Sequence, residues 1–251
     1  VNEKYRLRDY INSGKTTNGK AKIHTTYHYS YDKKNKGRQI VSGVGLQNLK
    51  REVRQTISRE YYYDIDMVNS EPTLLLNYCI KAGYECETVK YYCANRDKCL
   101  SDIRDGCKCG RDEAKRYVIR LINGGKPIIP VRIKWFEELS NEISKIHTMV
   151  AQNPAYEKRI AQISKVKCHN VIGTLLSEIF QEIENDCLLK CLEFIREDDE
   201  RLTKHIVLIF DGFMIPKDPK IDDEWLGKLS KYVKKSVGYD VKYIKKEMKD
   251  I

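Results

Sequence analysis

The chain has 251 residues, of which 41% are hydrophobic and 33% are charged, and its formal net charge is +10. This length and apolar content are enough for one large or two small domains with a real core. Because both signs of charge are plentiful, the composition favours a folded chain over a disordered one. The basic excess favours a polyanionic partner, of which nucleic acid is the commonest, although basic surfaces are also ordinary among folded proteins.

The sequence gives no sign of a membrane or secreted protein. No apolar run approaches the ~20 residues that are needed to cross a bilayer, and no signal peptide opens the chain. The nine cysteines are an odd number, and we interpret them as reduced thiols. We therefore expect an intracellular protein in a reducing compartment, at the site of replication in the host cell if the source is viral.

The N-terminal residues 1–36 are polar and rich in lysine, and they predict a basic arm or a loose hairpin. Phosphate contact and a solvated flank are equally good interpretations of this charge. In the next segment, 37–54, glycines permit close backbone approach. Cations and amides alternate there, which suits contacts to a nucleic-acid backbone; the residues concerned include Arg38, Gln47, Asn48, Lys50, Arg51 and Arg54.

The stretch 61–72 predicts a short strand followed by a helix. Asp64 and Asp66 alternate with apolar or aromatic residues, so a period of two places both carboxylates on one face of the strand. Pro72 suits the first turn of the helix, where a missing N–H costs nothing. Carboxylates at a strand end can hold a divalent metal against a phosphate. The alternative is a surface strand whose acids are simply solvated.

Residues 84–110 predict a cysteine-rich connector of mixed charge. Four of its cysteines could in principle hold zinc, but the spacing is irregular and only Cys107 and Cys109 are close together. Structural zinc sites usually show paired cysteines two to four residues apart. Ordinary thiols are therefore the preferred interpretation.

Residues 111–125 predict a helix that ends at a glycine. Arg111, Lys115, Ile119 and Asn123 recur every four residues and so share one stripe of this helix. Two cations on one stripe could bind a triphosphate. A basic, solvated helix face is the alternative and is more common in general.

The remaining elements are predicted to be mostly core. Residues 131–150, 155–167 and 170–195 have the periodicity of amphipathic helices. The apolar run 206–210, followed by Asp211 and Gly212, predicts a buried strand, a tight turn and a returning strand. An acid before glycine at a hairpin tip could be turn chemistry alone. A helix at 225–237 and a strand at 240–244 complete the chain.

Together these parts suggest a two-metal nucleotidyltransferase. In such enzymes two carboxylates from separate strands hold two Mg²⁺ ions about 3.5–4 Å apart, one activating a hydroxyl and the other holding the triphosphate. A helix bearing Arg and Lys neutralises the leaving pyrophosphate.

The order of these segments resembles that of family A DNA polymerases. Gly37-Arg38, Ser42 and Leu46-Gln47-Asn48-Leu49 are similar to the segment that precedes motif A of that family. Motif A itself is similar to 66–71, motif B to Arg111, Lys115, Ile119, Asn123 and Gly124, and motif C to 210–212. Asn170, Gly173 and Thr174 are similar to a further segment of the family.

The resemblance implies a mixed α/β (α+β) fold, with an antiparallel right-hand polymerase palm, helical fingers and an absent or minimal thumb. Its implied domains are a basic arm or thumb remnant at 1–36, palm with motif A at 37–80, fingers with motif B at 81–168, and palm with motif C at 169–251. It implies two Mg²⁺ ions, with Mn²⁺ as an alternative.

The resemblance also implies roles for individual residues. Asp66 and Asp211 would be the catalytic metal ligands with Asp64 as an accessory acid, and Lys115 would protonate the leaving pyrophosphate. The nucleotide would be bound by Arg111, Lys115, Ile119, Asn123 and Glu71. Of these, Glu71 would pack against the sugar and disfavour ribonucleotides. Primer and template would contact Arg38, Gln47, Asn48, Arg54 and Asn170.

The expected function is therefore primer extension on a DNA template with dNTPs. A primase-helicase on the same polypeptide or in the same replication complex is a further expected partner. Motif B lacks the family's aromatic residue and tyrosine, and motif C lacks His and Glu. These departures leave two alternatives open, namely a primase or RNA polymerase-like enzyme that uses rNTPs, and a non-catalytic nucleic-acid-binding module with a polymerase-like fold.

Overall fold

The computed structural model describes residues 2–17, 20–31, 36–126 and 132–248. The described chain is a mixture of helices and small antiparallel sheets and divides into two compact units. Unit 1 comprises 1–68 and 181–251, and unit 2 comprises 69–180. The predicted α+β class is thus confirmed, whereas the unit boundaries differ from the domain boundaries expected at 80/81 and 168/169.

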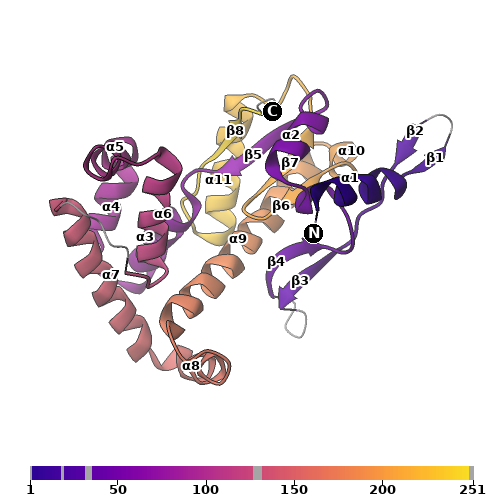
Figure 1. Cartoon of the computed structure of the whole chain (residues 1–251). Coiled ribbons are helices and arrows are strands. Elements are labelled where there is room, and N and C mark those ends of the chain that lie inside the picture. The colour runs from indigo at the N-terminus through magenta and orange to yellow at the C-terminus, as the bar shows by residue number, and fades with distance from the viewer. Residues whose placement is uncertain (1, 18–19, 32–35, 127–131, 249–251) are drawn as a thin grey trace. The chain divides into compact units, whose positions relative to one another are not determined.

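Unit 1 is built around a four-stranded antiparallel sheet in the order β6-β7-β5-β8 (Figure 1). Its strands are β5 (Tyr62–Met67), β6 (Val207–Ile209), β7 (Gly212–Pro216) and β8 (Tyr243–Lys246). Two separate hairpins precede this sheet in the chain: β1 (Lys15–Thr17) with β2 (Lys20–Lys22), and β3 (Tyr27–Tyr31) with β4 (Lys36–Val41). The helical elements of the unit are α1 (Glu3–Asn12), η2 (Leu46–Asn48), α2 (Arg51–Ser58), α10 (Glu200–Thr203), α11 (Asp223–Val237) and the second part of α9 (Val171–Asp198).

Apolar side chains cover both faces of the four-stranded sheet. On one face, the backbone N–H of Tyr243 donates to Ser230 Oγ of α11 at 3.1 Å, and Phe194 of α9 packs on Trp225 of α11 with ring centroids 5.3 Å apart. On the other face, η2 contributes to a buried cluster made by Leu46, Leu49, Ile209 and Met214. The sheet is therefore held between two helical layers of the same unit.

The ends of α11 show why this segment is helical. Asp222 caps its N-terminus by accepting a hydrogen bond of 2.8 Å from the backbone N–H of Trp225. Gly238 ends the helix in the left-handed conformation, with φ 70°. Between the caps, apolar residues three to four positions apart are buried; they are Trp225, Leu226, Leu229 and Val233.

Unit 2 is helical throughout its described part. Its elements are α3 (Ser70–Ala82), α4 (Glu87–Ala94), α5 (Arg96–Cys107), α6 (Arg111–Ile122), α7 (Lys134–Gln152), η3 (Pro154–Tyr156), α8 (Glu157–Ser164) and the first part of α9. Its core is formed by fully buried apolar side chains that include Leu74, Leu75, Leu100, Ile103, Val118, Leu139 and Ile146.

One sequence expectation about local structure is wrong. Residues 84–110 are not a connector, because they form α4 and α5 and bury Val89, Tyr92 and Leu100. Of the two interpretations of the N-terminal residues, a basic arm or a loose hairpin, the described residues show hairpins, β1–β2 and β3–β4, preceded by α1. Residues 1, 18–19 and 32–35 of this N-terminal segment, and residue 131 of the predicted 131–150 helix, lie outside the described residues.

Candidate metal centre

The sheet of unit 1 brings Asp66 and Asp211 to neighbouring strands. Asp66 lies near the end of β5, and its cross-strand partner on β7 is Gly212. Asp211 directly precedes Gly212, in the turn that joins β6 to β7. Phe210 opens this turn with a φ of 51°, a left-handed conformation that is uncommon for an aromatic residue. Antiparallel pairing therefore places two acids that are 145 positions apart in the sequence at one end of the sheet.

The Asp211 carboxyl is buried, and more negative than positive charge acts on it. Burial, followed by repulsion from Asp66 and Glu184, raises its pKa from 3.8 to about 7, while Arg38 acts in the opposite direction. The Glu184 side chain is only 1% exposed and is held by Arg38, with Nη2 2.7 Å and Nε 2.8 Å from the same carboxylate oxygen. A cation at Asp66 and Asp211 would relieve the repulsion between the two carboxylates.

Lys246 of β8 supplies one positive charge at this end of the sheet. Its ammonium forms an ion pair with Oδ2 of Asp66, and the two side chains are 39% and 16% exposed. In the strand register Lys246 lies opposite Asp64, and Asp66 lies opposite Ile244. The lysine therefore reaches diagonally across the ladder to Asp66.

Asp64 shares the face of Asp66 but has a different environment. Asp64 is 6% exposed, and Gln55 Nε2 of α2 donates to its Oδ2 at 3.5 Å. Burial and Asp66 raise the Asp64 pKa, while Lys246 and Arg54 lower it. Asp64 thus lies on the same strand as Asp66 and close enough to influence it electrostatically. Its roles as an accessory acid and a metal ligand stay predictions.

The predicted nucleic-acid contacts Gln47 and Asn48 are engaged with the protein's own backbone. Gln47 is 3% exposed. Its Oε1 accepts from Val41 N, and its Nε2 donates to the carbonyl oxygens of Gln39 and Leu208 at 2.8 and 3.0 Å. Asn48 Nδ2 donates to Gly43 O at 2.7 Å, and Asn48 Oδ1 accepts from Gly45 N at 3.1 Å. These amides hold β4 and the following loop in place.

The two predicted arginine contacts are also tied into unit 1. Arg38 pairs with Glu184, and its guanidinium carbon lies 5.4 Å from the centre of the Phe210 ring. Arg54 is 8% exposed, and its Nη1 donates to Leu49 O at 3.4 Å. The Arg38 guanidinium therefore lowers the pKa of the Asp211 carboxyl, and the Arg54 guanidinium lowers that of Asp64.

In unit 2, Arg111 and Lys115 lie on the exposed part of α6. Arg111 Nη2 lies 2.6 Å from Asp97 Oδ1, and Lys115 Nζ lies 3.1 Å from Asp112 Oδ1. Ile119 is half-buried on the same helix. The predicted stripe exists, since all three residues are on α6. Triphosphate binding by this stripe stays a prediction.

Asn123 and Glu71, two residues predicted to bind nucleotide, form a hydrogen bond with each other. Asn123, at the end of α6, donates from Nδ2 to Glu71 Oε2 of α3 at 2.8 Å. Its backbone carbonyl accepts from Asn170 Nδ2 at 2.8 Å. A Cβ on Gly173 would lie 2.1 Å from that carbonyl oxygen, so only glycine fits. The segments resembling motifs A and B and the Asn170 segment thus meet in one packed joint.

Sequence reasoning missed the two charged residues that set the electrostatics around Asp66 and Asp211. Glu184 interrupts the apolar stripe of α9 between Ile183 and Leu188, and a buried charge in such a stripe was the available signal. Lys246 was one of several lysines near the C-terminus, and only the β5–β8 register distinguishes it from its neighbours.

The residues of this end of the sheet suit a magnesium-type ion. Two carboxylates are enough for Mg²⁺, which keeps several waters and takes further oxygens from substrate phosphates. Among the described residues, no group of three or more His, Cys, Asp or Glu side chains could hold a metal ion by protein contacts alone. A tight all-protein cage is thus not the geometry here.

The cysteines of α4 and α5 lie in apolar surroundings. Burial raises the pKa of the Cys93 thiol to about 12 and that of Cys99 to about 11. Zinc binding needs the thiolate, which burial opposes. All nine cysteines of the chain lie within the described ranges, and each is a free thiol.

Comparison with known proteins gives one informative similarity. No protein-family profile matches the chain. The chain is 28% identical over 220 residues to a protein of Sputnik virophage named "Putative helicase V13", a match that covers 82% of this chain and 27% of that protein. The chain therefore spans about a quarter of the length of this relative. No helix in the described ranges is long and apolar enough to cross a membrane.

This similarity overturns the expected activity. The expectation was a primer-extending DNA polymerase, with an rNTP-using nucleotidyltransferase as an alternative. The relative is named as a helicase, and a helicase belongs to a different enzyme class because it separates strands and does not join nucleotides. The polymerase and nucleotidyltransferase assignments are accordingly wrong.

Proposed function

We propose that this chain is the nucleic-acid-binding part of a helicase-like replication protein, in which Asp66 and Asp211 hold a divalent cation against a phosphate of the nucleic acid. One observation carries the proposal: Asp66 pairs with Gly212, so Asp211 lies at the same end of the sheet, where burial and then repulsion from Asp66 raise its pKa to about 7. Mg²⁺ is the expected ion, with Mn²⁺ as a substitute, because both take carboxylate and phosphate oxygens.

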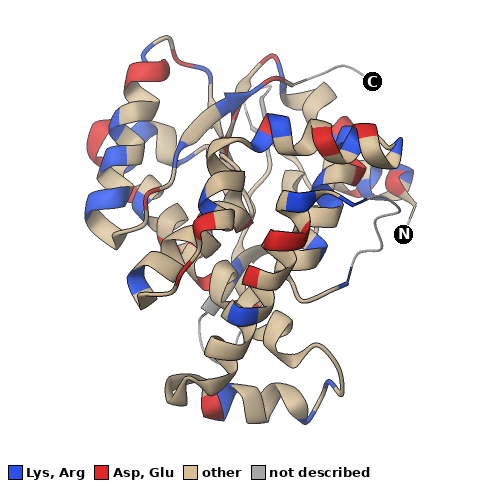
Figure 2. Ribbon diagram, turned by 90° about the vertical axis from the view of Figure 1, so that its left-hand side faces the viewer, with Lys and Arg blue, Asp and Glu red and all other residues tan. Residues whose placement is uncertain are grey.

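Nucleic acid is the proposed partner because an aromatic ring of β5 has cations of neighbouring segments beside it. The centre of the Tyr63 ring lies 4.3 Å from Lys245 Nζ of β8 and 5.8 Å from Lys217 Nζ, which follows β7. Aromatic rings with adjacent cations suit bases and phosphates of single strands. Figure 2 shows Lys and Arg interleaved with Asp and Glu along the helices, so the net charge of +10 is not confined to one element.

We assign the motor activity of the relative to a region other than this chain. Gly14-Lys15-Thr16 matches the end of the phosphate-binding loop of P-loop motors, but Asp9 occupies the position of its first glycine. That loop joins a strand to a following helix. Here the tripeptide follows helix α1 and enters the β1–β2 hairpin, the reverse order. The helicase name belongs to a relative of which this chain spans 27%.

The resemblance to family A polymerases is, in this proposal, one of fold alone. An antiparallel sheet with acids at the ends of neighbouring strands supports a palm-like arrangement in unit 1. The chemistry of that family is not carried over. Fold and activity are separable, because many activities occur on one scaffold.

The test is nucleic-acid binding with and without the metal. Fluorescence anisotropy with a labelled single-stranded oligonucleotide would compare the wild type with Asp66→Asn and Asp211→Asn, in Mg²⁺ and in EDTA. We expect Mg²⁺ to tighten binding by the wild type about threefold or more, since a bridging cation offsets carboxylate–phosphate repulsion, and to have no such effect on either variant.

A matched control is Glu85→Gln, which removes an exposed carboxylate of unit 2. It should retain the full Mg²⁺ effect. Equal Mg²⁺ dependence in the wild type and both aspartate variants would refute the metal-bridged model. ATP hydrolysis by this chain alone would refute the assignment of the motor to another region.

A further inference from the structure

Lys246 occupies the position beside Asp66 that a metal ion would need. Its ammonium is paired with Oδ2 of Asp66, one of the two carboxylates proposed to bind the ion. The charges close together here are those of four carboxylates and three cations, namely Asp64, Asp66, Glu184, Asp211, Arg38, Arg54 and Lys246. With all four carboxylates ionised these seven formal charges sum to −1, and a divalent ion added beside Lys246 would leave an excess of positive charge.

We propose that Lys246 is a built-in counter-ion that competes with the divalent cation, so that metal binding requires its ammonium to leave Asp66. The inference rests on the proposed metal site. In this proposal Lys246 has a positioning role, and it raises the metal concentration that is needed to fill the site. Two cations at one carboxylate repel each other, whereas either alone is stabilised by it.

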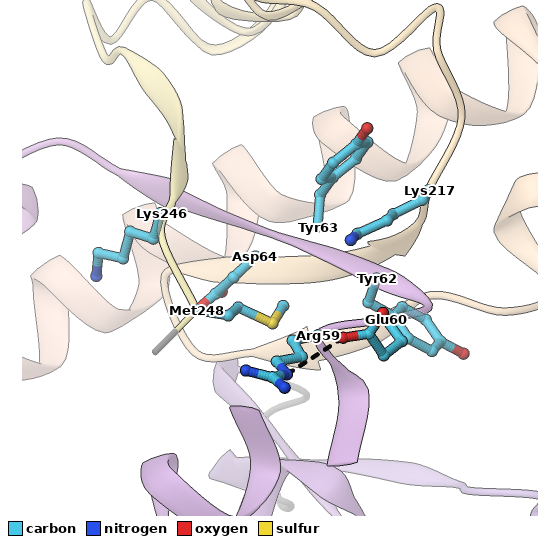
Figure 3. A pocket seen from close by; sticks show the side chains of 8 residues that line it. All are labelled: Arg59, Glu60, Tyr62, Tyr63, Asp64, Lys217, Lys246 and Met248. Atoms are coloured by element: carbon cyan, nitrogen blue, oxygen red, sulfur yellow. Dashed lines mark ion pairs between the residues drawn. The ribbon is translucent and has the colours of Figure 1, made fainter. Parts of the chain in front are cut away.

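A pocket beside β5 contains a second carboxylate for the displaced ammonium. This pocket has a volume of about 250 Å³ and is lined by Lys246 together with Asp64, Arg59, Tyr62 and others. Figure 3 shows Lys246 on one side of this pocket, with Asp64 between it and the ion pair of Arg59 with Glu60. Burial and Asp66 raise the pKa of the Asp64 carboxyl, whereas the Lys246 ammonium lowers it, so the two side chains already attract each other. Asp64 is thus a second carboxylate with which the ammonium can pair when it leaves Asp66, in a lining that also carries Arg59 and Lys217.

The chain offers a matched control at the next position. Lys245 is on the same strand and carries the same charge, but it lies on the opposite face, where its ammonium is 4.3 Å from the centre of the Tyr63 ring. Lys245→Met and Lys246→Met change the net charge by the same amount. A difference in metal affinity between the two variants therefore reflects the position of the lysine and not the overall charge of the chain.

The experiment is a titration of the full chain with Mn²⁺ alone, followed by the EPR signal of the free ion. We expect Lys246→Met to bind Mn²⁺ about fivefold more tightly than the wild type, because its competitor is gone. Lys245→Met should stay within about twofold, since screening weakens effects between exposed charges. Lys246→Arg keeps the charge and should also stay within about twofold of the wild type.

Two results would overturn the inference: equal or weaker Mn²⁺ binding by Lys246→Met, or tightening by Lys246→Arg as large as that by Lys246→Met. Asp66→Asn separates this failure from failure of the metal site, because unchanged Mn²⁺ binding by that variant would place the ion elsewhere. If Lys246→Met folds poorly, Lys246→Gln provides the same comparison, and the rise in Tm on adding Mn²⁺ should be larger for it than for the wild type.

Discussion

Gly212 and Asp66 lie directly opposite each other on neighbouring strands, and no other residue could take the place of the glycine. A Cβ at position 212 would lie 2.2 Å from the carbonyl oxygen of Ile65 and 3.1 Å from the Cα of Asp66. These contacts are with backbone, which cannot move aside as a flexible side chain can. The close approach of β7 to β5 is thus what brings Asp211 beside Asp66.

Gly212→Ala should lower the free energy of unfolding by more than about 2 kcal/mol, because the added methyl group forces the two strands apart. Chemical denaturation with urea would measure the change. Gly227→Ala is the matched control, since position 227 is inside α11 and a Cβ there meets nothing within 4 Å. That variant should gain about 0.5–1 kcal/mol from helix propensity. A harmless Gly212→Ala would contradict the close approach.

Arg38→Met should destabilise unit 1 by about 3 kcal/mol, because it removes the guanidinium from a buried glutamate. The Glu184 side chain is 1% exposed and that of Arg38 is 28% exposed. The double variant Arg38→Met, Glu184→Met should recover at least half of the loss, since it removes the buried charge as well. Thermal and urea unfolding of the wild type, the single variant and the double variant would measure how much of the lost stability the second substitution restores. Equal losses in the single and double variants would show that the ion pair is not responsible.

The hydrogen bond from Asn123 to Glu71 should be visible in a double-mutant cycle on unfolding. A hydrogen bond to a charged group contributes about 1.5–3 kcal/mol, so Asn123→Ala and Glu71→Ala should show a coupling energy of about 1 kcal/mol or more. Glu71→Gln retains an acceptor for Asn123 Nδ2 and should lose less than Glu71→Ala. Additive losses from the two alanine substitutions would show that the 2.8 Å contact does not stabilise the joint.

The raised pKa of Asp211 predicts a dependence of stability on pH in metal-free buffer. The folded state keeps this proton up to about pH 7, whereas the unfolded chain releases it near the ordinary value of 3.8. Between these values the folded state binds more protons, so the contribution of Asp211 to stability falls as pH rises from about 4 to about 7. Asp211→Asn should therefore be more stable than the wild type by more than about 1 kcal/mol at pH 8.

That comparison is made by urea unfolding in EDTA at pH 5 and pH 8. The advantage of Asp211→Asn should be smaller at pH 5, where the native carboxyl of the wild type is already protonated. Adding Mn²⁺ at pH 8 should restore stability to the wild type and not to the variant. An advantage that is equal at both pH values would show that Asp211 titrates normally.

Local sequence patterns were sufficient for most of the helices and for the central strand. The period of two at 62–67 predicted a strand with Asp64 and Asp66 on one face, and β5 has this form. The end of the helix at 111–122 was readable because Gly124 and Gly125 follow it, although the capping residue itself is Asn123. The helices α4 and α5 were missed because cysteines and charges obscured an apolar face that only packing within unit 2 reveals.

The sequence by itself determined the α+β class, the positions of the acids on their strands, and a basic chain suited to nucleic acid. Tertiary structure alone decided which residues meet. Strand register makes Gly212 the partner of Asp66 and sends Lys246 to that carboxylate, and α9 places Glu184 and its partner Arg38 close to Asp211. The reason is physical: periodicity fixes the face on which a side chain lies, whereas register and helix packing join segments more than a hundred residues apart, and these long-range pairings leave no local signal.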